Sequence, residues 1–420
     1  MHHQESKHHV YTLGFFSVVL AFFFLNGFLP KGQGRKRADE KAAPQDAARP
    51  AAPNLHDSGL AFEMRGQGLP RGGQWRGLPA VADLDGDGHL DIACSIRKAD
   101  GLHVLFGDGK GGFTDSDQDF NKADGYGGAE IMDMNGDGKP DIIFGTHRAP
   151  MVVYQNLGER RFKETSQGLD NEEIVSDVAA GDLDGDKIPD IAAIGLFGGG
   201  IFLWKGDGRG GFTRIPNKIY KNDAFGREIL IADVNADGRG DIVVTQQGPK
   251  VLLSKEEGFK FQDQSQGLPV PLTTGTDQSI AVADVDGDGK LEIALATIAI
   301  EGNPGVEVFK LGADGAWASL AHGLPRGLTT SSVVFGDVDG DKKIDLLVAS
   351  EERGLTIFLG DGHGNWKDAG SVPDTARLKN SVAISDLDRD GRADLVSVFP
   401  YQPGAVQVWF GKPLTVPPAR

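Results

Sequence analysis

Residues Asp83–Asp91 read DLDGDGHLD, a nine-residue frame with acidic side chains at positions 1, 3, 5 and 9. Six later frames keep this pattern, with Asp or Asn at position 3 and Asp or Glu at position 9. They begin at Asp133, Asp182, Asp233, Asp284, Asp337 and Asp386, so that successive frames start 49 to 53 residues apart. A repeat of this length predicts a set of similar structural units stacked side by side or closed into a ring.

Each frame offers side-chain oxygens at positions 1, 3, 5 and 9 and a backbone carbonyl at position 7. A short loop of this composition surrounds Ca²⁺, which takes about six to eight oxygen ligands. Zinc and copper fit poorly, because Cys94 is the only cysteine and His89 the only histidine within a frame. We therefore predict up to seven Ca²⁺ ions rather than plain Asp/Gly turns, which are the simpler alternative for a single copy.

The predicted ligands fall into seven sets, in which position 7 contributes its carbonyl oxygen. They are Asp83, Asp85, Asp87, His89 and Asp91; Asp133, Asn135, Asp137, Lys139 and Asp141; Asp182, Asp184, Asp186, Ile188 and Asp190; Asp233, Asn235, Asp237, Arg239 and Asp241; Asp284, Asp286, Asp288, Lys290 and Glu292; Asp337, Asp339, Asp341, Lys343 and Asp345; and Asp386, Asp388, Asp390, Arg392 and Asp394.

The acidity of the chain is concentrated in these frames. The formal net charge is -17, whereas the frames alone hold 26 carboxylates, so the rest of the chain is net positive. The acidic balance is thus ligand charge and not a surface for a basic partner. Nucleic acid is also an unsuitable partner, because no basic stripe interleaved with aromatic residues is present.

Short apolar runs of strand length surround every frame, such as Ser279–Ala283 before one and Asp141–Phe144 after another. A third run follows about ten residues later, for example Gly101–Phe106, and then a Gly-rich turn. A fourth run begins with an aromatic residue: Phe113, Phe162, Phe212, Phe259 with Phe261, Trp317 and Trp366. Four strands per repeat in seven repeats predict an all-β fold, a seven-bladed β-propeller with four-stranded blades.

These repeats resemble the FG-GAP or VCBS repeats of the integrin α-chain head and of bacterial surface proteins. The resemblance covers Ser58 to about Lys412 and implies that the metal loops join the first and second strands on one face, with ligands using the opposite face. Two frames depart from the pattern, because Lys187 and Lys342 stand where Gly would most easily adopt a positive φ angle. We expect these two sites to bind more weakly.

The closure of the ring is predicted from the two ends of the repeats. The seventh repeat has a third strand at Ala405–Phe410 but no aromatic fourth strand after it. A fourth-strand pattern instead precedes the first frame, at Gly59–Met64, and resembles Arg161–Glu164. We expect the N-terminal segment to complete blade seven, which removes two open sheet edges.

The N-terminal residues have a different composition. Val10–Leu29 is a stretch of twenty residues without a charge, long enough to span about 30 Å of hydrocarbon. We predict a hydrophobic anchor helix or signal segment at 1–30, a disordered Ala/Pro-rich linker at 31–57, the propeller at 58–412 and a tail at 413–420. An uncleaved membrane anchor is favoured, because no clear small-residue cleavage site follows Leu29.

The location of the propeller is predicted from two opposing signals. Basic residues between Lys31 and Arg37 follow the apolar segment, which favours a cytoplasmic propeller. Calcium loops of extracellular affinity, however, would be empty at cytosolic Ca²⁺ concentrations. We give more weight to the seven loops and expect a membrane-anchored propeller outside the cytoplasm, or a secreted one if the segment is cleaved.

Loops on the face opposite the frames carry aromatic, Arg and amide side chains suited to sugars or peptide loops. The candidate ligand-binding residues are Trp75, Arg76, Tyr126, His147, Arg148, Gln246 and Tyr401. The favoured function is a binding or adhesion module for a glycan or protein. A polysaccharide lyase or hydrolase stays open, with His147, Arg148 and Tyr401 as base, charge neutraliser and acid, and so does a structural role in the envelope. No nucleophile motif stands out, so we predict no catalytic residues.

Overall fold

The computed structural model describes residues 53–70, 75–96, 101–120, 128–146, 150–169, 175–195, 200–216, 219, 226–246, 248–256, 258–269, 277–297, 305–373, 375, 381–398 and 406–413. Over these residues the chain forms 28 β-strands and one short 3-10 helix, η1 (Leu55–Ser58), which confirms the all-β prediction. No helix in this part of the chain is long and apolar enough to cross a membrane. The apolar segment Val10–Leu29 lies outside the described residues.

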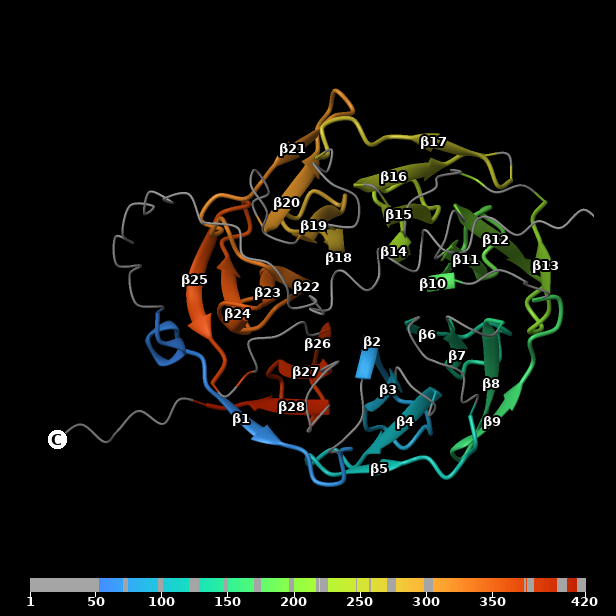
Figure 1. Cartoon of the computed structure of the whole chain (residues 1–420), viewed down its shortest axis with the longest axis horizontal. Coiled ribbons are helices and arrows are strands. Elements are labelled where there is room, and N and C mark those ends of the chain that lie inside the picture. Colours follow the sequence, from blue (N-terminus) through green and yellow to red (C-terminus); the bar gives the residue numbers. More distant parts are fainter. Residues whose placement is uncertain are drawn as a thin grey trace, which may run out of the picture. The chain divides into compact units, whose positions relative to one another are not determined.

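The strands form seven antiparallel four-stranded sheets arranged around a common centre (Figure 1). Blade one contains β2 (Trp75–Ala82), β3 (Asp91–Ile96), β4 (Gly101–Gly107) and β5 (Phe113–Asp115); blade two contains β6 (Ala129–Met132), β7 (Asp141–Phe144), β8 (Val152–Gly158) and β9 (Arg161–Glu164); blade three contains β10 (Val175–Gly181), β11 (Asp190–Gly195), β12 (Ile201–Gly206) and β13 (Phe212–Arg214).

The next three blades follow the same order. Blade four contains β14 (Gly226–Ala232), β15 (Asp241–Gln246), β16 (Pro249–Ser254) and β17 (Phe261–Asp263); blade five contains β18 (Asp277–Ala283), β19 (Glu292–Thr297), β20 (Val306–Leu311) and β21 (Trp317–Ser319); blade six contains β22 (Thr330–Gly336), β23 (Asp345–Ser350), β24 (Gly354–Gly360) and β25 (Trp366–Ser371).

Blade seven closes the ring with strands from both ends of the repeat region. It contains β26 (Ser381–Ser385), β27 (Asp394–Val398), β28 (Val406–Gly411) and, as its outer strand, β1 (Phe62–Arg65). The register pairs Phe62 with Gly411 and Arg65 with Val408. The predicted closure is confirmed. Ordered structure begins before the predicted boundary at residue 58, because η1 buries Leu55 in the core between blades six and seven.

The core consists of seven hydrophobic clusters, each of which joins two neighbouring blades. The second residue of every frame points into one of them. Leu84, for example, packs with Phe144 and Val152 of the next blade. The members of this set are all buried: Leu84, Met134, Leu183, Val234, Val285, Val338 and Leu387. Each acidic loop is therefore anchored to the blade that follows it.

Glycines form tight joints between blades. Gly168, after β9, has a φ angle of +84°, and a Cβ atom at this position would lie 1.8 Å from the carbonyl oxygen of Phe212 in the next blade. Beside this contact, the Phe212 N–H donates to the Gln167 carbonyl at 3.0 Å. The same close approach occurs at three other positions, Gly68, Gly267 and Gly323. Only glycine allows the two backbones to come so close.

Three inner strands carry carboxylates that point away from solvent. Asp177 of β10 accepts hydrogen bonds from the N–H groups of Gly128 and Ile229, in the blades on either side, at 3.1 Å each. Burial raises the pKa of Asp177 to about 7. Burial, with the Asp177 charge as a second cause, raises the pKa of Glu228 on β14 to about 8 and also raises that of Glu130 on β6. Asp177 and Glu228 thus link blades two to five around the centre.

Glu228 is the most deeply placed of the three. Its Oε2 accepts from the N–H of Ile280 in blade five at 2.6 Å, whereas its Oε1 is buried without a hydrogen-bond partner in the described part of the chain. In the following blade Ser279 occupies the equivalent position and its hydroxyl accepts from the N–H of Val333 at 3.4 Å. A charged Glu228 is thus only half satisfied, and its neutral form is favoured in the folded protein.

We expect Gly168→Ala to lower stability by about 3 kcal/mol or more, because the added methyl group would overlap the Phe212 carbonyl. Gly59→Ala is the matched control, since Gly59 has a φ angle of +85° with nothing within 4 Å of the added Cβ. That substitution should cost about 1 kcal/mol from backbone strain alone. Thermal and urea unfolding measure the loss of stability in both variants. Equal losses would contradict the proposed steric conflict at Gly168.

Glu228→Gln should remove a loss of stability that occurs as pH rises from about 5 to about 8. The folded pKa of Glu228, about 8, lies above the ordinary value of 4.5, so unfolding releases a proton between these values and wild-type stability falls as pH rises from about 5 to about 8. The Gln variant should gain on the order of 3 kcal/mol relative to wild type across this range. Melting temperatures at both ends of the range, in constant Ca²⁺, measure the gain. The exposed Glu256→Gln control should show none, and a Gln variant that tracks wild type would refute the assignment.

Candidate metal centre

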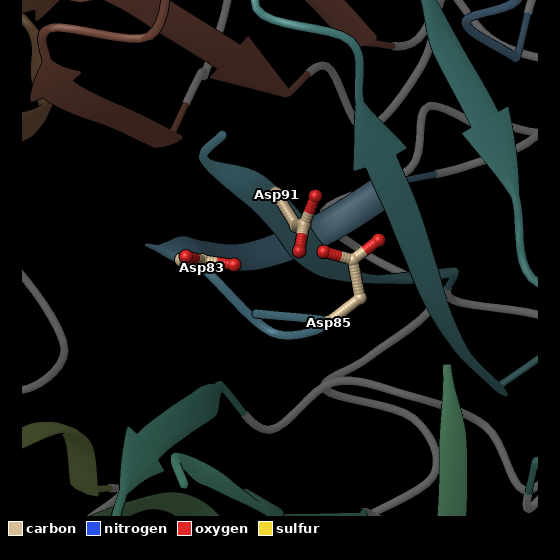
Figure 2. A group of neighbouring side chains, drawn as sticks. All are labelled: Asp83, Asp85 and Asp91. Carbon is tan, nitrogen blue, oxygen red and sulfur yellow. The ribbon is translucent and has the colours of Figure 1, made fainter. Parts of the chain in front are cut away.

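Each frame is the hairpin loop between the first and second strands of its blade. In blade one the loop joins β2 to β3, and carboxylate oxygens of Asp83, Asp85 and Asp91 lie within 4.8 Å of one another. Figure 2 shows the Asp85 and Asp91 carboxylates facing each other across the loop. The nine-residue loop thus gathers three carboxylates at one place.

Hydrogen bonds inside the loop fix the direction of its carboxylates. Asp83 accepts from the N–H of Gly86 at 2.8 Å through Oδ1 and from that of Gly88 at 2.9 Å through Oδ2. Asp85 accepts from the N–H of Asp87 at 3.0 Å through Oδ1. The second oxygen of Asp85 contacts the Arg160 guanidinium at 2.7 Å. Hydrogen bonds within the protein therefore define the shape of the loop without a bound ion.

The carboxylate at position 9 is buried in every frame. Asp91 accepts from the N–H of Leu84 at 2.7 Å with one oxygen and from that of Gly107, on the third strand, at 2.8 Å with the other. Burial raises the pKa of Asp91 to about 7, and the neighbouring Asp85 and Asp87 charges add to the effect. The same cause raises the pKa values of the six equivalent residues, Asp141, Asp190, Asp241, Glu292, Asp345 and Asp394, to between about 6 and 7. A cation beside them would favour their ionised form.

Backbone strain in the loops is concentrated at positions 4 and 6. Lys187 and Lys342, at position 6, both adopt a left-handed conformation with φ of 68°. The expectation that they weaken their sites remains a prediction. Two further non-glycine residues adopt this conformation and were not predicted, Ala236 at φ 61° and Arg389 at φ 55°, both at position 4. The signal was available, because the other frames have Gly there.

The structure brings together three carboxylates in five of the seven frames. The groups are Asp83, Asp85 and Asp91; Asp182, Asp184 and Asp190; Asp284, Asp286 and Glu292; Asp337, Asp339 and Asp345; and Asp386, Asp388 and Asp394. The two other frames have Asn135 and Asn235 at position 3, each accepting a hydrogen bond through its amide oxygen from the N–H two residues later. An amide oxygen is also a Ca²⁺ ligand, so these frames keep the loop with one charge fewer.

Several oxygens in the frames fit a hard cation and lack another partner. Asp286 Oδ1, Glu292 Oε1 and Asp388 Oδ1 are buried and accept no hydrogen bond within the described residues. A buried carboxylate oxygen without a donor is costly, and a bound cation removes that cost. Because the side-chain donors are all oxygen, the set suits Ca²⁺ rather than a softer metal.

Basic side chains contact every frame. In blade one Arg160, from the β8–β9 turn, lies 2.7 Å from Asp85 and 3.9 Å from Asp87, and its guanidinium stacks over the Phe106 ring at 4.6 Å. In four frames the position 7 residue contacts the Asp at position 5 of the same loop; these residues are Lys139, Arg239, Lys343 and Arg392. Protein cations thus offset part of the loop charge.

The predicted ligand face is described only in part. Trp75 begins β2 and is fully buried, with its ring 5.0 Å from that of His103, so its side chain is not available to a ligand. Its assignment to the exposed face fails because the strand starts earlier than the loop composition suggested. The other candidates, or their side chains, lie outside the described residues: Arg76, Tyr126, His147, Arg148, Gln246 and Tyr401.

Four spans of the chain match the FG-GAP-like repeat, residues 83–144, 133–193, 233–295 and 337–397. Each runs from one frame to the strand after the next frame, and together they cover more than half of the chain. The chain belongs to the FG-GAP-like repeat family. No curated protein shows a significant match to it.

Solved structures with similar folds have low sequence identity to this FG-GAP-like protein. One is an Agrocybe aegerita lectin, described as specific for non-reducing terminal N-acetylglucosamine, with a TM-score of 0.50 and 20% identity over 79% of this chain and 84% of the lectin. Another is BBS1N in complex with ARL6DN, with a TM-score of 0.52 and 11% identity over 81% and 93% of the two chains. A third is an extracellular domain from B. thetaiotaomicron, with a TM-score of 0.50 and 15% identity over 83% of this chain and 39% of that chain. These similarities show a shared fold.

Proposed function

We propose that this protein is a Ca²⁺-binding β-propeller that works outside the cytoplasm as a binding module for a glycan or protein ligand. The observation that carries the metal part is the buried, partnerless carboxylate oxygen in the frames, as at Asp286 and Glu292. Side chains at positions 1, 3, 5 and 9 and the carbonyl at position 7 would hold the ion. Bound Ca²⁺ would supply positive charge and draw these oxygens together.

The binding role is supported by the family and by the surface. FG-GAP-like repeats form the propeller, and a lectin from Agrocybe aegerita has a similar fold. Among the described residues only Met64 and Leu157 are large apolar side chains with high exposure, at 52% and 41%. This described part of the surface favours polar ligands such as sugars, or a protein partner held by polar contacts.

The proposed location rests on calcium supply. Loops with affinities of about 10⁻⁴ to 10⁻³ M are filled in extracellular fluid and empty in the cytosol. Frames without an ion would leave several carboxylates in mutual repulsion, such as Asp337, Asp339 and Asp345, which lie within 4.8 Å of one another. We therefore propose that the propeller folds and works where Ca²⁺ is plentiful.

Removal of Ca²⁺ should lower the melting temperature by many degrees. At about 1 mM Ca²⁺ and a Kd of about 10⁻⁴ M, each occupied site adds roughly 1.4 kcal/mol to the free energy of unfolding. Asp386→Ala, in frame seven, should lose about that much, and Asp117→Ala, at an exposed acid outside the frames, should lose none. Differential scanning calorimetry with and without EDTA, together with elemental analysis, measures the effect and the stoichiometry. Two ions or fewer per chain, or a melting temperature unaffected by EDTA, would disprove the metal assignment.

Ligand binding should depend on the face opposite the metal loops. We expect Tyr126→Ala with Tyr401→Ala to weaken retention on a responsive polysaccharide or glycan at least about tenfold. Met64→Ala is the control, because Met64 is exposed on the outer strand of blade seven. A panel of neutral and acidic polysaccharides, scored for retention and for new reducing or unsaturated ends, measures binding and cleavage together. New ends would assign the protein to the lyases or hydrolases instead, and retention unchanged in the double variant would exclude this face.

A further inference from the structure

Two lysines reach into the frames of their own blades from the third strand. The ammonium group of Lys205, on β12, contacts Asp184 and lies 2.6 Å from Asp186. That of Lys310, on β20, contacts Asp286 in the same way and lies 2.8 Å from Asp288. In both blades one ammonium group therefore bridges the carboxylates at frame positions 3 and 5.

The two ammonium groups use the oxygens that an ion would need. Asp186 accepts from the N–H of Ile188 at 2.9 Å through Oδ1, and it is Oδ2 that contacts Lys205. Asp288 likewise accepts from the N–H of Lys290 at 2.9 Å through Oδ1, and its Oδ2 contacts Lys310. Backbone bonds thus occupy one oxygen of each Asp, and the lysine competes with a divalent cation for the other.

The position of these lysines on the strand is specific. Lys205 follows Trp204, which pairs with Ile191, and Lys310 follows Phe309, which pairs with Ile293. The residue at the same register is uncharged in the other five blades: Phe106, Gln155, Leu253, Leu359 and Phe410. Blades three and five therefore differ from the rest in a side chain that faces the metal loop.

The bridged carboxylates at position 3 are largely shielded from water, whereas Asp186 and Asp288 at position 5 are 34% and 38% exposed. The side chains of Asp184 and Asp286 are 11% and 19% exposed, and that of Lys310 is 28% exposed. The ammonium group of Lys205 also lies 5.9 Å from the centre of the Phe259 ring in blade four, where it can make a cation–π contact. Charge-assisted hydrogen bonds to partly buried carboxylates are stronger than those on an open surface.

We propose that Lys205 and Lys310 are built-in counter-ions that occupy the cation position of frames three and five and lower the Ca²⁺ affinity of those two frames. This inference rests on the proposed Ca²⁺ binding. An ion entering either frame must displace an ammonium group from two carboxylates, whereas in frames four and six Arg239 and Lys343 contact only the position 5 carboxylate. The propeller then has two classes of site, and blades three and five keep their loops charge-balanced when Ca²⁺ is scarce.

The test compares ion counts in the full-length chain. Native mass spectrometry at buffered free Ca²⁺ should show that Lys205→Met with Lys310→Met fills about two more sites than wild type at intermediate concentrations. We expect the affinity of those sites to rise about 10- to 100-fold, because two charge-assisted contacts no longer oppose binding. Lys163→Met with Lys367→Met removes the same charge from exposed positions of β9 and β25 and should match wild type.

A reciprocal variant keeps the test decisive if the double substitution disturbs folding. Leu359→Lys places a lysine at the same register in blade six, where it can reach Asp339 and Asp341, and should remove about one ion at the same free Ca²⁺. Ion counts that are equal in wild type and both kinds of variant would overturn the role of the lysines while leaving Ca²⁺ binding intact. No bound Ca²⁺ in wild type or any variant would overturn the proposed function and this inference together.

Discussion

The structure depends on one buried carboxylate per blade, at the last position of each acidic frame. In blade one Asp91 accepts from the N–H of Leu84 within the loop and from that of Gly107 on the third strand, so a single side chain ties the loop to the sheet. Because Leu84 also packs against the next blade, this tie extends around the ring. An ion held beside Asp91 would act on the sheet and on the blade interface. Binding of an ion at this position would therefore be coupled to folding.

The seven frames differ in how the negative charge of their carboxylates is compensated. Two have an Asn at position 3, and the others collect three carboxylates within 4.8 Å. Three of these five, in blades one, three and five, are contacted at positions 3 and 5 by a basic side chain from another strand or turn: Arg160, Lys205 and Lys310. The pattern follows from electrostatics, since a partly buried carboxylate cluster requires compensation from an ion or from the protein. Repeats that look alike in sequence thus differ in how much of their charge the protein itself balances.

The fold could be predicted from sequence because its signals are local and repeated. The spacing of the frames gave the number of blades, and the orphan strand at Phe62–Arg65 gave the closure onto β28. Contacts that depend on strand register could not be predicted. Lys205 meets Asp184 only because β12 pairs with β11 in one particular alignment. Trp75 was misplaced for a related reason, since the pairing of β2 with β3 shifts between Arg76 and Ala80 and the strand begins farther upstream than its composition indicates.

The inner strands carry different polar side chains in different blades, although the acidic loops of the blades are similar. Blades three and four place Asp177 and Glu228 where blade five places Ser279, and each of these side chains accepts a backbone N–H from the following blade. The hydrogen-bonding role is therefore preserved while the charge is not. A serine hydroxyl can accept the same backbone hydrogen bond as a carboxylate, and it avoids the free-energy cost of burying a charge. Burial raises the pKa of the acids on the inner strands of blades two to four, so these blades add a pH dependence of stability to that of the position 9 carboxylates, which all seven frames share.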